Sequence, residues 1–281
     1  YLTPAERVSV FSLVSVAFGR GAAALKRSAK FGKLRGEPPY GPAGAALVLA
    51  DGSLALDRVE AASIRFPALE DVSVNLSAAN SKPIADARRA PILAKLCTFT
   101  FMTNLDLSFN YIAVVPDAIG ALTNLKYLHL SGNKIATLPA SIGRLAALET
   151  LYLHCNSLTA VPASISSLTA LTTLYLNSNR ITTLPDWIGG MTALTTLSLR
   201  KNQLAGLPDA IGQLTGLKKL HLNNNRLAAI PESIVALTNL TELLLFQANP
   251  QLIRTAQSAA VQAWLQALKG SRLARLRRII H

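Results

Sequence analysis

Histidine can bind metal ions and transfer protons, and three of the four histidines lie in the central part of the chain, at His129, His154 and His221. The repeat described below places His129 and His154 on neighbouring strands, close enough for two imidazoles to approach one metal ion. A closed zinc site needs four ligands, and Asp106 is the only acid beside this pair. The histidines are therefore predicted to be polar side chains of a surface, with no metal and no cofactor.

Enzyme motifs are absent from the sequence. It contains no GxxxxGK[ST] loop, no GxSxG elbow, no HExxH and no kinase-type glycine loop. Gly120, Gly143, Gly189 and Gly212 recur at fixed positions between apolar segments, where a structural use is expected. No carboxylate pair has catalytic spacing. The sequence therefore favours a chain that is not an enzyme.

The cysteines bear on the compartment. Cys97 and Cys155 are the only two, too few for a disulfide framework or a CxxC metal knuckle. We expect Cys97 in the core of a cap, and a reducing, cytoplasmic location. The apolar stretch 8–18 is too short to span a bilayer and shows no cleavage site, so no targeting segment is predicted. A chain that starts with Tyr1 suggests a fragment or a processed product.

Charge is distributed unevenly along the chain. The net charge is +13, and residues 1–50 and 251–281 carry most of the basic excess while the middle is nearly neutral. Basic ends attract polyanions, so contact of the ends with an anionic membrane is an open prediction. Among the arginines near the C-terminus only Trp264 could stack on a base, which disfavours nucleic acid as a partner.

A repeat of 23 residues organises the middle of the chain. Six units follow the consensus LxxLxLxxNxLxxLPxxIGxLT without drift of the Asn or the Pro, with substitutions at some of the other positions, and a seventh unit starts at Leu240 and places its Asn one residue late, at Asn249. The two leucines of LxL point to one side of a strand, and the amide of the following Asn can satisfy buried backbone groups of the next coil. The expected asparagine ladder comprises Asn110, Asn133, Asn156, Asn179, Asn202 and Asn225.

This pattern resembles the leucine-rich-repeat family, in particular its 23-residue intracellular, Ras-group type with a Leu-Pro pair after the Asn. The resemblance covers residues 96–250 and implies an α/β solenoid, a horseshoe with a parallel sheet on its concave face. The flank after Pro250, a helix ending in Leu-Lys-Gly-Ser before a basic stretch, resembles the repeat region of Roco proteins. No phosphate loop accompanies it.

Five segments follow from these patterns. Residues 1–45 form a basic, helical N-terminal flank, with a capping box at Thr3 to Glu6, and residues 46–95 an N-terminal cap or degenerate repeats. Residues 96–250 hold six regular units and a partial seventh. A single helix from Gln251 to Leu268 is expected to cap the last unit within 251–270, and residues 271–281 form a basic tail or linker.

The side chains that alternate with the strand leucines should form the concave surface. They are aromatic in the early units and basic in the later ones, and strands lie about 4.8 Å apart, so the early ones should form one patch. Tyrosine and arginine often anchor protein interfaces, so the patch is a candidate binding site. The alternative is that Tyr and Thr occur here only because β-strands favour them. The candidate partner-binding residues are Tyr127, His129, Tyr152, His154, Tyr175, Asn177, Arg200, Lys219 and His221.

The sequence therefore predicts a protein-protein interaction module, a scaffold or regulatory domain in intracellular signalling that binds another protein and no small-molecule substrate. One alternative is a partner-selecting domain of a larger enzyme, such as a Roco-type GTPase or a ubiquitin ligase, with its catalytic part outside this chain. Another is a receptor-type recognition domain.

Overall fold

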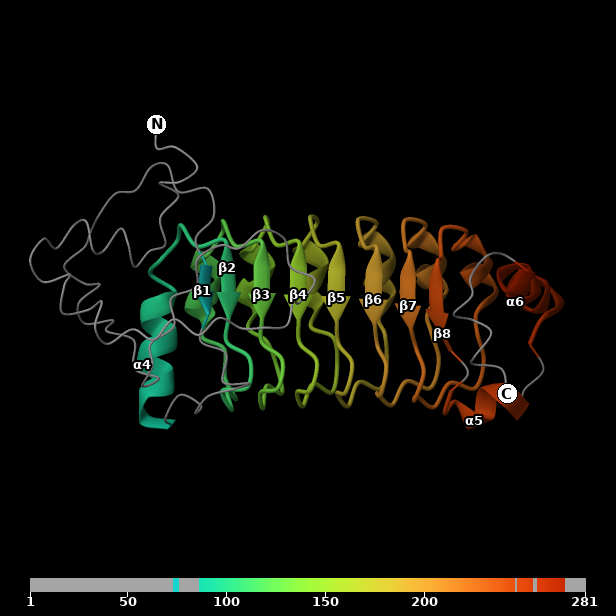
Figure 1. Ribbon diagram of the computed structural model, residues 1–281, viewed down its shortest axis with the longest axis horizontal. Helices are drawn as coiled ribbons and strands as arrows, with labels where there is room; N and C mark the ends of the chain where they lie inside the picture. Colours follow the sequence, from blue (N-terminus) through green and yellow to red (C-terminus); the bar gives the residue numbers. More distant parts are fainter. Residues whose placement is uncertain (1–72, 76–85, 246, 255–256, 271–281) are drawn as a thin grey trace, which may run out of the picture.

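The computed structural model describes residues 73–75, 86–245, 247–254 and 257–270. Within them a parallel sheet of 8 strands runs in the order β1 to β8, so each strand pairs with its neighbours in the sequence. Figure 1 shows the strands side by side along the length of the molecule, with the connections stacked behind them. The strands are β1 Ser73–Asn75, β2 Asn104–Asp106, β3 Tyr127–His129, β4 Thr150–Tyr152, β5 Thr173–Tyr175, β6 Thr196–Ser198, β7 Lys219–His221 and β8 Glu242–Leu244.

The strand leucines fix the register. Leu105 pairs with Leu128, which pairs with Leu151, and the same pairing continues to Leu243. Each of these side chains points into the core, while the residues on either side point to the concave face. Val74 of β1 takes the leucine position opposite Leu105. β1 lies in the part of the sequence expected to hold a cap or degenerate repeats.

A short 3-10 helix follows the proline of each regular unit on the convex side. A proline with an extended backbone stands directly before the first residue of each 3-10 helix. Proline has no N–H to donate to a neighbouring strand, so it suits a position outside the sheet. The glycines of these turns allow neighbouring coils to approach: a Cβ on Gly120 would lie 2.6 Å from the carbonyl oxygen of Ser141. The helices are η3 Asp117–Ala121, η4 Ala140–Arg144, η5 Ala163–Ser167, η6 Asp186–Gly190, η7 Asp209–Gln213 and η8 Glu232–Ala236.

The asparagines form a ladder of hydrogen bonds between coils. The Asn133 amide donates to the carbonyl oxygen of Leu130 in its own unit at 2.9 Å and to that of Leu107 in the preceding unit at 3.0 Å. Its carbonyl oxygen accepts the Ile112 N–H at 2.9 Å. Asn249, displaced by one residue, still accepts the Leu227 N–H at 3.2 Å. Buried backbone groups that would otherwise cost free energy are thereby paired.

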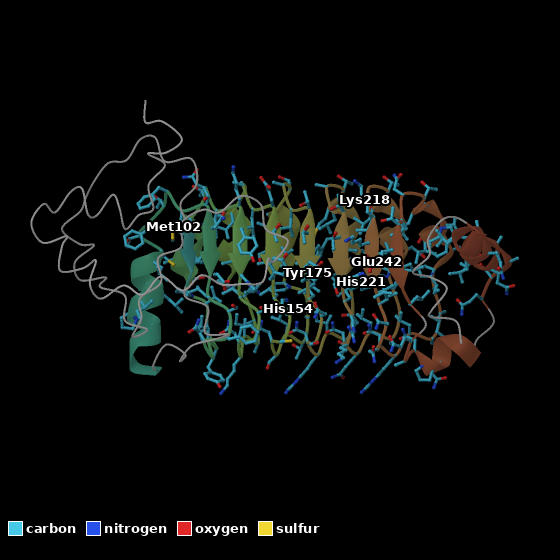
Figure 2. All side chains as sticks on the ribbon, in the orientation of Figure 1. Met102, His154, Tyr175, Lys218, His221 and Glu242 are labelled. Atoms are coloured by element: carbon cyan, nitrogen blue, oxygen red, sulfur yellow. The ribbon has the colours of Figure 1, made fainter. Side chains whose placement is uncertain are left out.

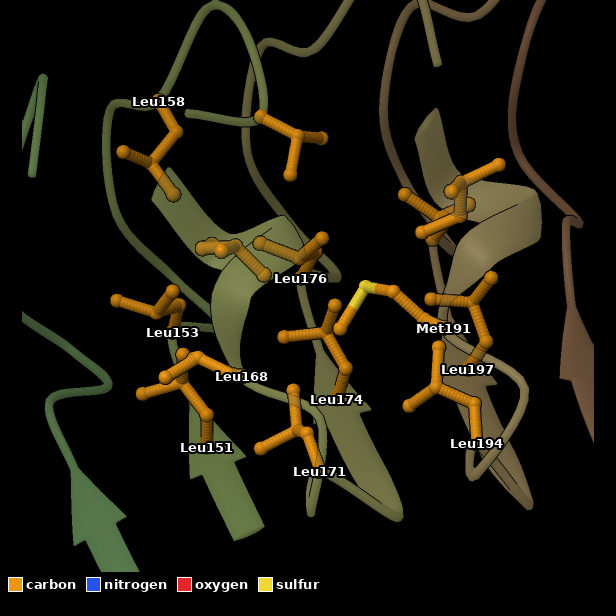
Figure 3. Close-up of a cluster of buried hydrophobic side chains, with 14 of the residues drawn as sticks. Leu151, Leu153, Leu158, Leu168, Leu171, Leu174, Leu176, Met191, Leu194 and Leu197 are labelled. Atoms are coloured by element: carbon orange, nitrogen blue, oxygen red, sulfur yellow. The ribbon is translucent and has the colours of Figure 1, made fainter. Parts of the chain in front are cut away.

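The core is a continuous column of leucine and isoleucine between the sheet and the 3-10 helices. Leu151, Leu174 and Leu197 of successive strands belong to this column, and Met191 fills a position that is leucine in other units (Figure 3). Each unit buries its leucine face against the next, which is how a solenoid whose units contact only their neighbours is stabilised.

Helix α4, Asp86–Leu96, precedes the first regular unit and was not expected from the sequence. It replaces the 3-10 helix between β1 and β2. Ile92, Leu93 and Leu96 are buried, and Cys97 directly after the helix is buried with them. The helix therefore closes this end of the core, and Cys97 lies in the core as expected.

The C-terminal cap differs from the expected single helix, which is a correction. Two helices occur, α5 Pro250–Arg254 and α6 Ala259–Gly270, separated by Gln257 and Ser258. The Gln257 side-chain oxygen accepts the Ile230 N–H at 3.2 Å, and the Ser258 hydroxyl oxygen accepts the Val261 N–H at 3.4 Å. These two bonds attach the chain to the last unit and start a new helix, so one continuous helix cannot form.

The helical flank predicted over 1–45, most of the segment 46–95 and the tail 271–281 lie outside the described residues. Among the helices of the described part, none has the length and apolar character required to cross a membrane.

Candidate functional site

The concave face of the sheet carries the candidate residues. Strands β3, β4 and β5 place Tyr127, Tyr152 and Tyr175 on it, with His129 from β3 and His154 directly after β4. Register pairs His129 with Tyr152 and Tyr152 with Tyr175. All five are half-buried by each other, so they are less exposed than a simple alternation of core and surface residues implies. We call these five residues the Tyr/His ladder.

The rings of the Tyr/His ladder are in direct contact. Ring centroids lie 5.5 Å apart for Tyr127 and Tyr152, 4.9 Å for His129 and Tyr152, and 5.7 Å for His129 and His154. Tyr152 and Tyr175 are stacked, with centroids 5.0 Å apart and planes at 13°. Such pairs each contribute about 0.5–1.5 kcal/mol beyond the area they bury.

The stacking determines what a partner would contact. Because Tyr152 and Tyr175 stack from one strand to the next, their ring faces are directed along the solenoid and their edges toward the concave space. A flat ligand cannot lie on a face that is already covered. The surface therefore offers ring edges and polar tips, a combination suited to a protein surface.

His129 is held by hydrogen bonds on both ring nitrogens. Nδ1 lies 3.2 Å from Oδ2 of Asp106, and the Ser131 hydroxyl bonds to Nε2. Burial raises the pKa of the Asp106 carboxyl, but bonds and positive charge from His129 and the bonds from Ser108 outweigh it and lower that pKa. Asp106 is thus a carboxylate that fixes the orientation of His129.

Asp106, His129 and Ser131 include the residue types of a Ser-His-Asp triad. The Ser131 side chain is 0% exposed, because the His129 ring covers it. A nucleophile must reach its substrate, so the Ser131 hydroxyl cannot attack one in this arrangement. The three residues hold the aromatic surface in place. Strand alternation predicts that Ser131 lies on the surface, and the sequence gives no indication of this role.

His154 is neutral at physiological pH. Burial, together with the charge of His129, lowers the pKa of the His154 imidazole to about 4. Nδ1 of His154 is buried without a hydrogen-bond partner among the described atoms. His154 therefore adds no charge to the Tyr/His ladder.

A second, charged cluster lies toward the C-terminal end. Nε2 of His221 lies 3.3 Å from Oε1 of Glu242, and the Lys219 ammonium lies 3.8 Å from Oε2 of the same residue. Burial lowers the pKa of His221 more than the Glu242 carboxylate raises it. Figure 2 shows His221 beside Glu242, apart from His154 and Tyr175.

The basic extension expected through Arg200 and Lys219 is therefore only partly present. Glu242 neutralises Lys219, and its effect follows from the register that pairs the two residues. Arg200 is exposed, Asn177 is half-buried beside the Tyr/His ladder, and Ser198 between the two clusters is buried. Among the described residues no group of three or more His, Cys, Asp or Glu could hold a metal ion.

Comparison with known sequences agrees with the observed architecture. A family model described as "Leucine-rich repeat region" matches residues 87–203, and one described as "Leucine rich repeat" matches residues 193–250. No curated protein matches the chain.

Several solved structures are similar. The plant peptide hormone receptor RGFR1, in complex with RGF2, is 27% identical with a TM-score of 0.55, over 62% of this chain and 32% of the receptor. The ectodomain of the Arabidopsis thaliana receptor kinase GASSHO1/SCHENGEN3, in complex with Casparian strip integrity factor 2, is 34% identical with a TM-score of 0.51, over 54% of this chain and 19% of that one.

An internalin, InlF from Listeria monocytogenes, shares the fold at 23% identity and a TM-score of 0.50, over 67% of this chain and 53% of the internalin. The chain thus spans about half or less of the length of these proteins. With the family matches, the parallel sheet and the asparagine ladder in agreement, the chain is a leucine-rich-repeat protein.

Proposed function

We propose that this chain binds a partner protein on its concave face, with the Tyr/His ladder as the centre of the contact. The observation that carries the proposal is the continuous contact of five aromatic side chains across β3, β4 and β5. Hydrogen bonds to Asp106 and Ser131 hold His129 in place before any partner arrives. A prearranged surface loses little side-chain entropy on binding, which favours affinity.

The comparisons support a protein or peptide as the partner. Two plant receptors of this fold, at 27% and 34% identity, were solved in complex with RGF2 and with Casparian strip integrity factor 2. The aromatic Tyr/His ladder beside the charged residues Arg200, Lys219 and Glu242 provides the aromatic centre and polar rim typical of protein interfaces.

We further propose a scaffold or regulatory role in intracellular signalling, in a repeat protein of the 23-residue type. Two features support a cytoplasmic location. Each regular unit carries an apolar residue and a proline after its Asn, which is Leu-Pro in three units, Val-Pro in two and Ile-Pro in one. Cys97 and Cys155 are both free, and Cys155 is exposed, which suits a reducing compartment.

Changing Tyr152 and Tyr175 together to Ala tests the concave face. We expect partner capture from a lysate of the native source to fall at least tenfold, because two central aromatic anchors are removed. The stacked rings also support the sheet, so the same change should lower the free energy of unfolding by about 1–2 kcal/mol. Quantitative pull-down and urea unfolding measure the two effects.

Two further variants make the outcome decisive. Tyr152→Phe with Tyr175→Phe keeps the stack and removes only the hydroxyl groups, and Tyr111→Ala removes an exposed tyrosine outside the concave face. Tyr111→Ala should retain every partner. Full retention of the same partners by the Tyr-to-Ala double variant would show that they bind elsewhere.

A further inference from the structure

The turns that follow the strands form one continuous side of the solenoid, which we call the Asn-turn edge. It comprises residues 109–114, 132–137, 155–160, 178–183, 201–206 and 224–229. Lys218, directly before β7, lies at the upper edge in Figure 2, so the strands start there and the Asn turns run along the opposite, lower edge. In Figure 1 that lower edge is nearly straight and leads into α5.

Charge on the Asn-turn edge is of one sign. Residues 101–250 contain nine basic and seven acidic residues; four of the basic ones and none of the acidic ones belong to this edge. The acids lie on the concave face, on the opposite edge and in the first turns of the convex helices. The four basic residues are Lys134, Arg180, Lys201 and Arg226.

These four side chains are exposed, and their backbone is held by hydrogen bonds. No described acidic residue forms an ion pair with them. Their backbone N–H groups all donate to a neighbouring coil, as Arg180 does to Leu158 at 2.8 Å and Lys201 to Asn223 at 3.0 Å. Arg180, Lys201 and Arg226 come from three successive coils, which are about 5 Å apart. Arg180 and Arg226 directly follow the Asn of their coils and Lys201 directly precedes its own, so the three form a staggered row, which we call the cation row.

The first turn of the same edge carries exposed apolar side chains. The described residues contain four large hydrophobic side chains that are exposed, and three of them are in this turn: Val114 at 76%, Tyr111 at 49% and Phe109 at 42%. Large apolar side chains that gather at one place on a surface indicate a contact. Here they continue a row of cations.

We propose that the Asn-turn edge docks on an anionic lipid bilayer. Phe109, Tyr111 and Val114 would enter the interfacial region, where aromatic and aliphatic side chains are stable, and the cation row would lie against the headgroups. A straight edge can contact a flat surface along its whole length. The surface differs from the concave face, so a docked molecule keeps the Tyr/His ladder free for a protein.

The aromatic geometry distinguishes lipid from nucleic acid. Binding of single strands relies on open ring faces for base stacking. The Phe109 ring lies against the backbone of Gly132, and the Lys134 ammonium lies 5.1 Å from the centre of the Tyr111 ring. One face of each ring is thus occupied. Val114, the most exposed of the three, has neither a ring that could stack on a base nor a polar atom that could bond to one. Its aliphatic side chain can pack against an acyl chain.

Vesicle sedimentation tests the proposal on the full chain. Vesicles contain phosphatidylcholine alone or phosphatidylcholine and phosphatidylserine at about 7:3. We expect binding to the anionic vesicles only, reduced by salt. The variant Arg180→Glu, Lys201→Glu, Arg226→Glu should bind them at least about 100-fold more weakly, since each basic residue near the surface contributes about fivefold.

A matched control separates the edge from the overall charge. Lys126→Glu, Arg144→Glu, Lys218→Glu changes the net charge equally at exposed positions away from this edge. It should bind within about threefold of the wild type. Val114→Ser should weaken binding severalfold without any change of charge. Equal loss in both triple variants, or binding of single-stranded DNA without binding of anionic vesicles, would overturn the proposal.

A native cysteine reports contact directly. Cys155 is exposed on the Asn-turn edge, whereas Cys97 is buried and burial raises the pKa of its thiol to about 11, so a thiol-reactive, polarity-sensitive dye should label Cys155 selectively. Its emission should shift to the blue with phosphatidylserine vesicles. No shift, despite sedimentation of the protein, would mean that another surface holds the membrane.

Discussion

His154 is neutral in the folded chain at pH values where a free imidazole is partly protonated. Burial, with the charge of His129, lowers its pKa from 6.5 to about 4. Between pH 6.5 and about pH 4 the unfolded chain binds more protons than the folded chain. The free energy of unfolding is therefore highest above pH 6.5 and falls as the pH is lowered. We expect a loss of roughly 1–2 kcal/mol by pH 4 after screening by solvent. Urea unfolding should show a smaller loss in His154→Gln; an identical loss in both proteins would assign it to other groups.

At the scale of residues, the sequence predicted the face of the sheet on which a side chain lies better than it predicted which neighbours cover that side chain. The columns of the repeat placed Tyr127, Tyr152 and Tyr175 on one face because strand alternation leaves no other place for them. The same alternation assigned Ser131 to the surface, where the His129 ring covers it. Covering of one side chain by another depends on rotamers, which spacing does not specify. The role of these residues in binding stays a prediction.

Two adjacent glycines test how the convex helices pack. A Cβ on Gly189 would lie 2.7 Å from the Ala210 carbonyl oxygen of the next coil, whereas a Cβ on Gly190 would meet nothing within 4 Å. Gly189→Ala should therefore destabilise by roughly 1–3 kcal/mol, because backbone must move. Gly190→Ala should be neutral or stabilise by about 0.5 kcal/mol. Thermal unfolding measures both; equal effects would contradict the close approach of η6 and η7.

At the scale of elements, the strands and turns of the repeat could be predicted from the sequence, and the elements that occur only once could not. The strands and outer turns recur in every unit, so each unit supports the interpretation of the others. Helix α4 and the break before α6 occur once, and each depends on a local contact with the end of the solenoid, such as the bond from Ile230 to Gln257. A repeated pattern gives no information about such contacts.

The whole molecule is held together by neighbours alone, so damage at one end should spread gradually. Val261 of α6 is 0% exposed and belongs to the core that continues from the last unit. Val261→Asp should bury an unpaired carboxyl and destabilise the cap by roughly 3 kcal/mol. Hydrogen exchange should accelerate most in β8 and η8 and least in β3. Gln266→Asp, at an exposed position of the same helix, is the control, and a uniform acceleration along the chain would contradict the expectation.

The asparagine ladder also has a consequence for inheritance. Each amide bonds to a carbonyl 3 residues back and another 26 residues back, and these offsets are the same for Asn133, Asn156, Asn179 and Asn202. Loss or duplication of one whole unit by unequal recombination therefore leaves every donor opposite an acceptor. The length of the concave face and of the Asn-turn edge can change in a single genetic event, while the core stays closed.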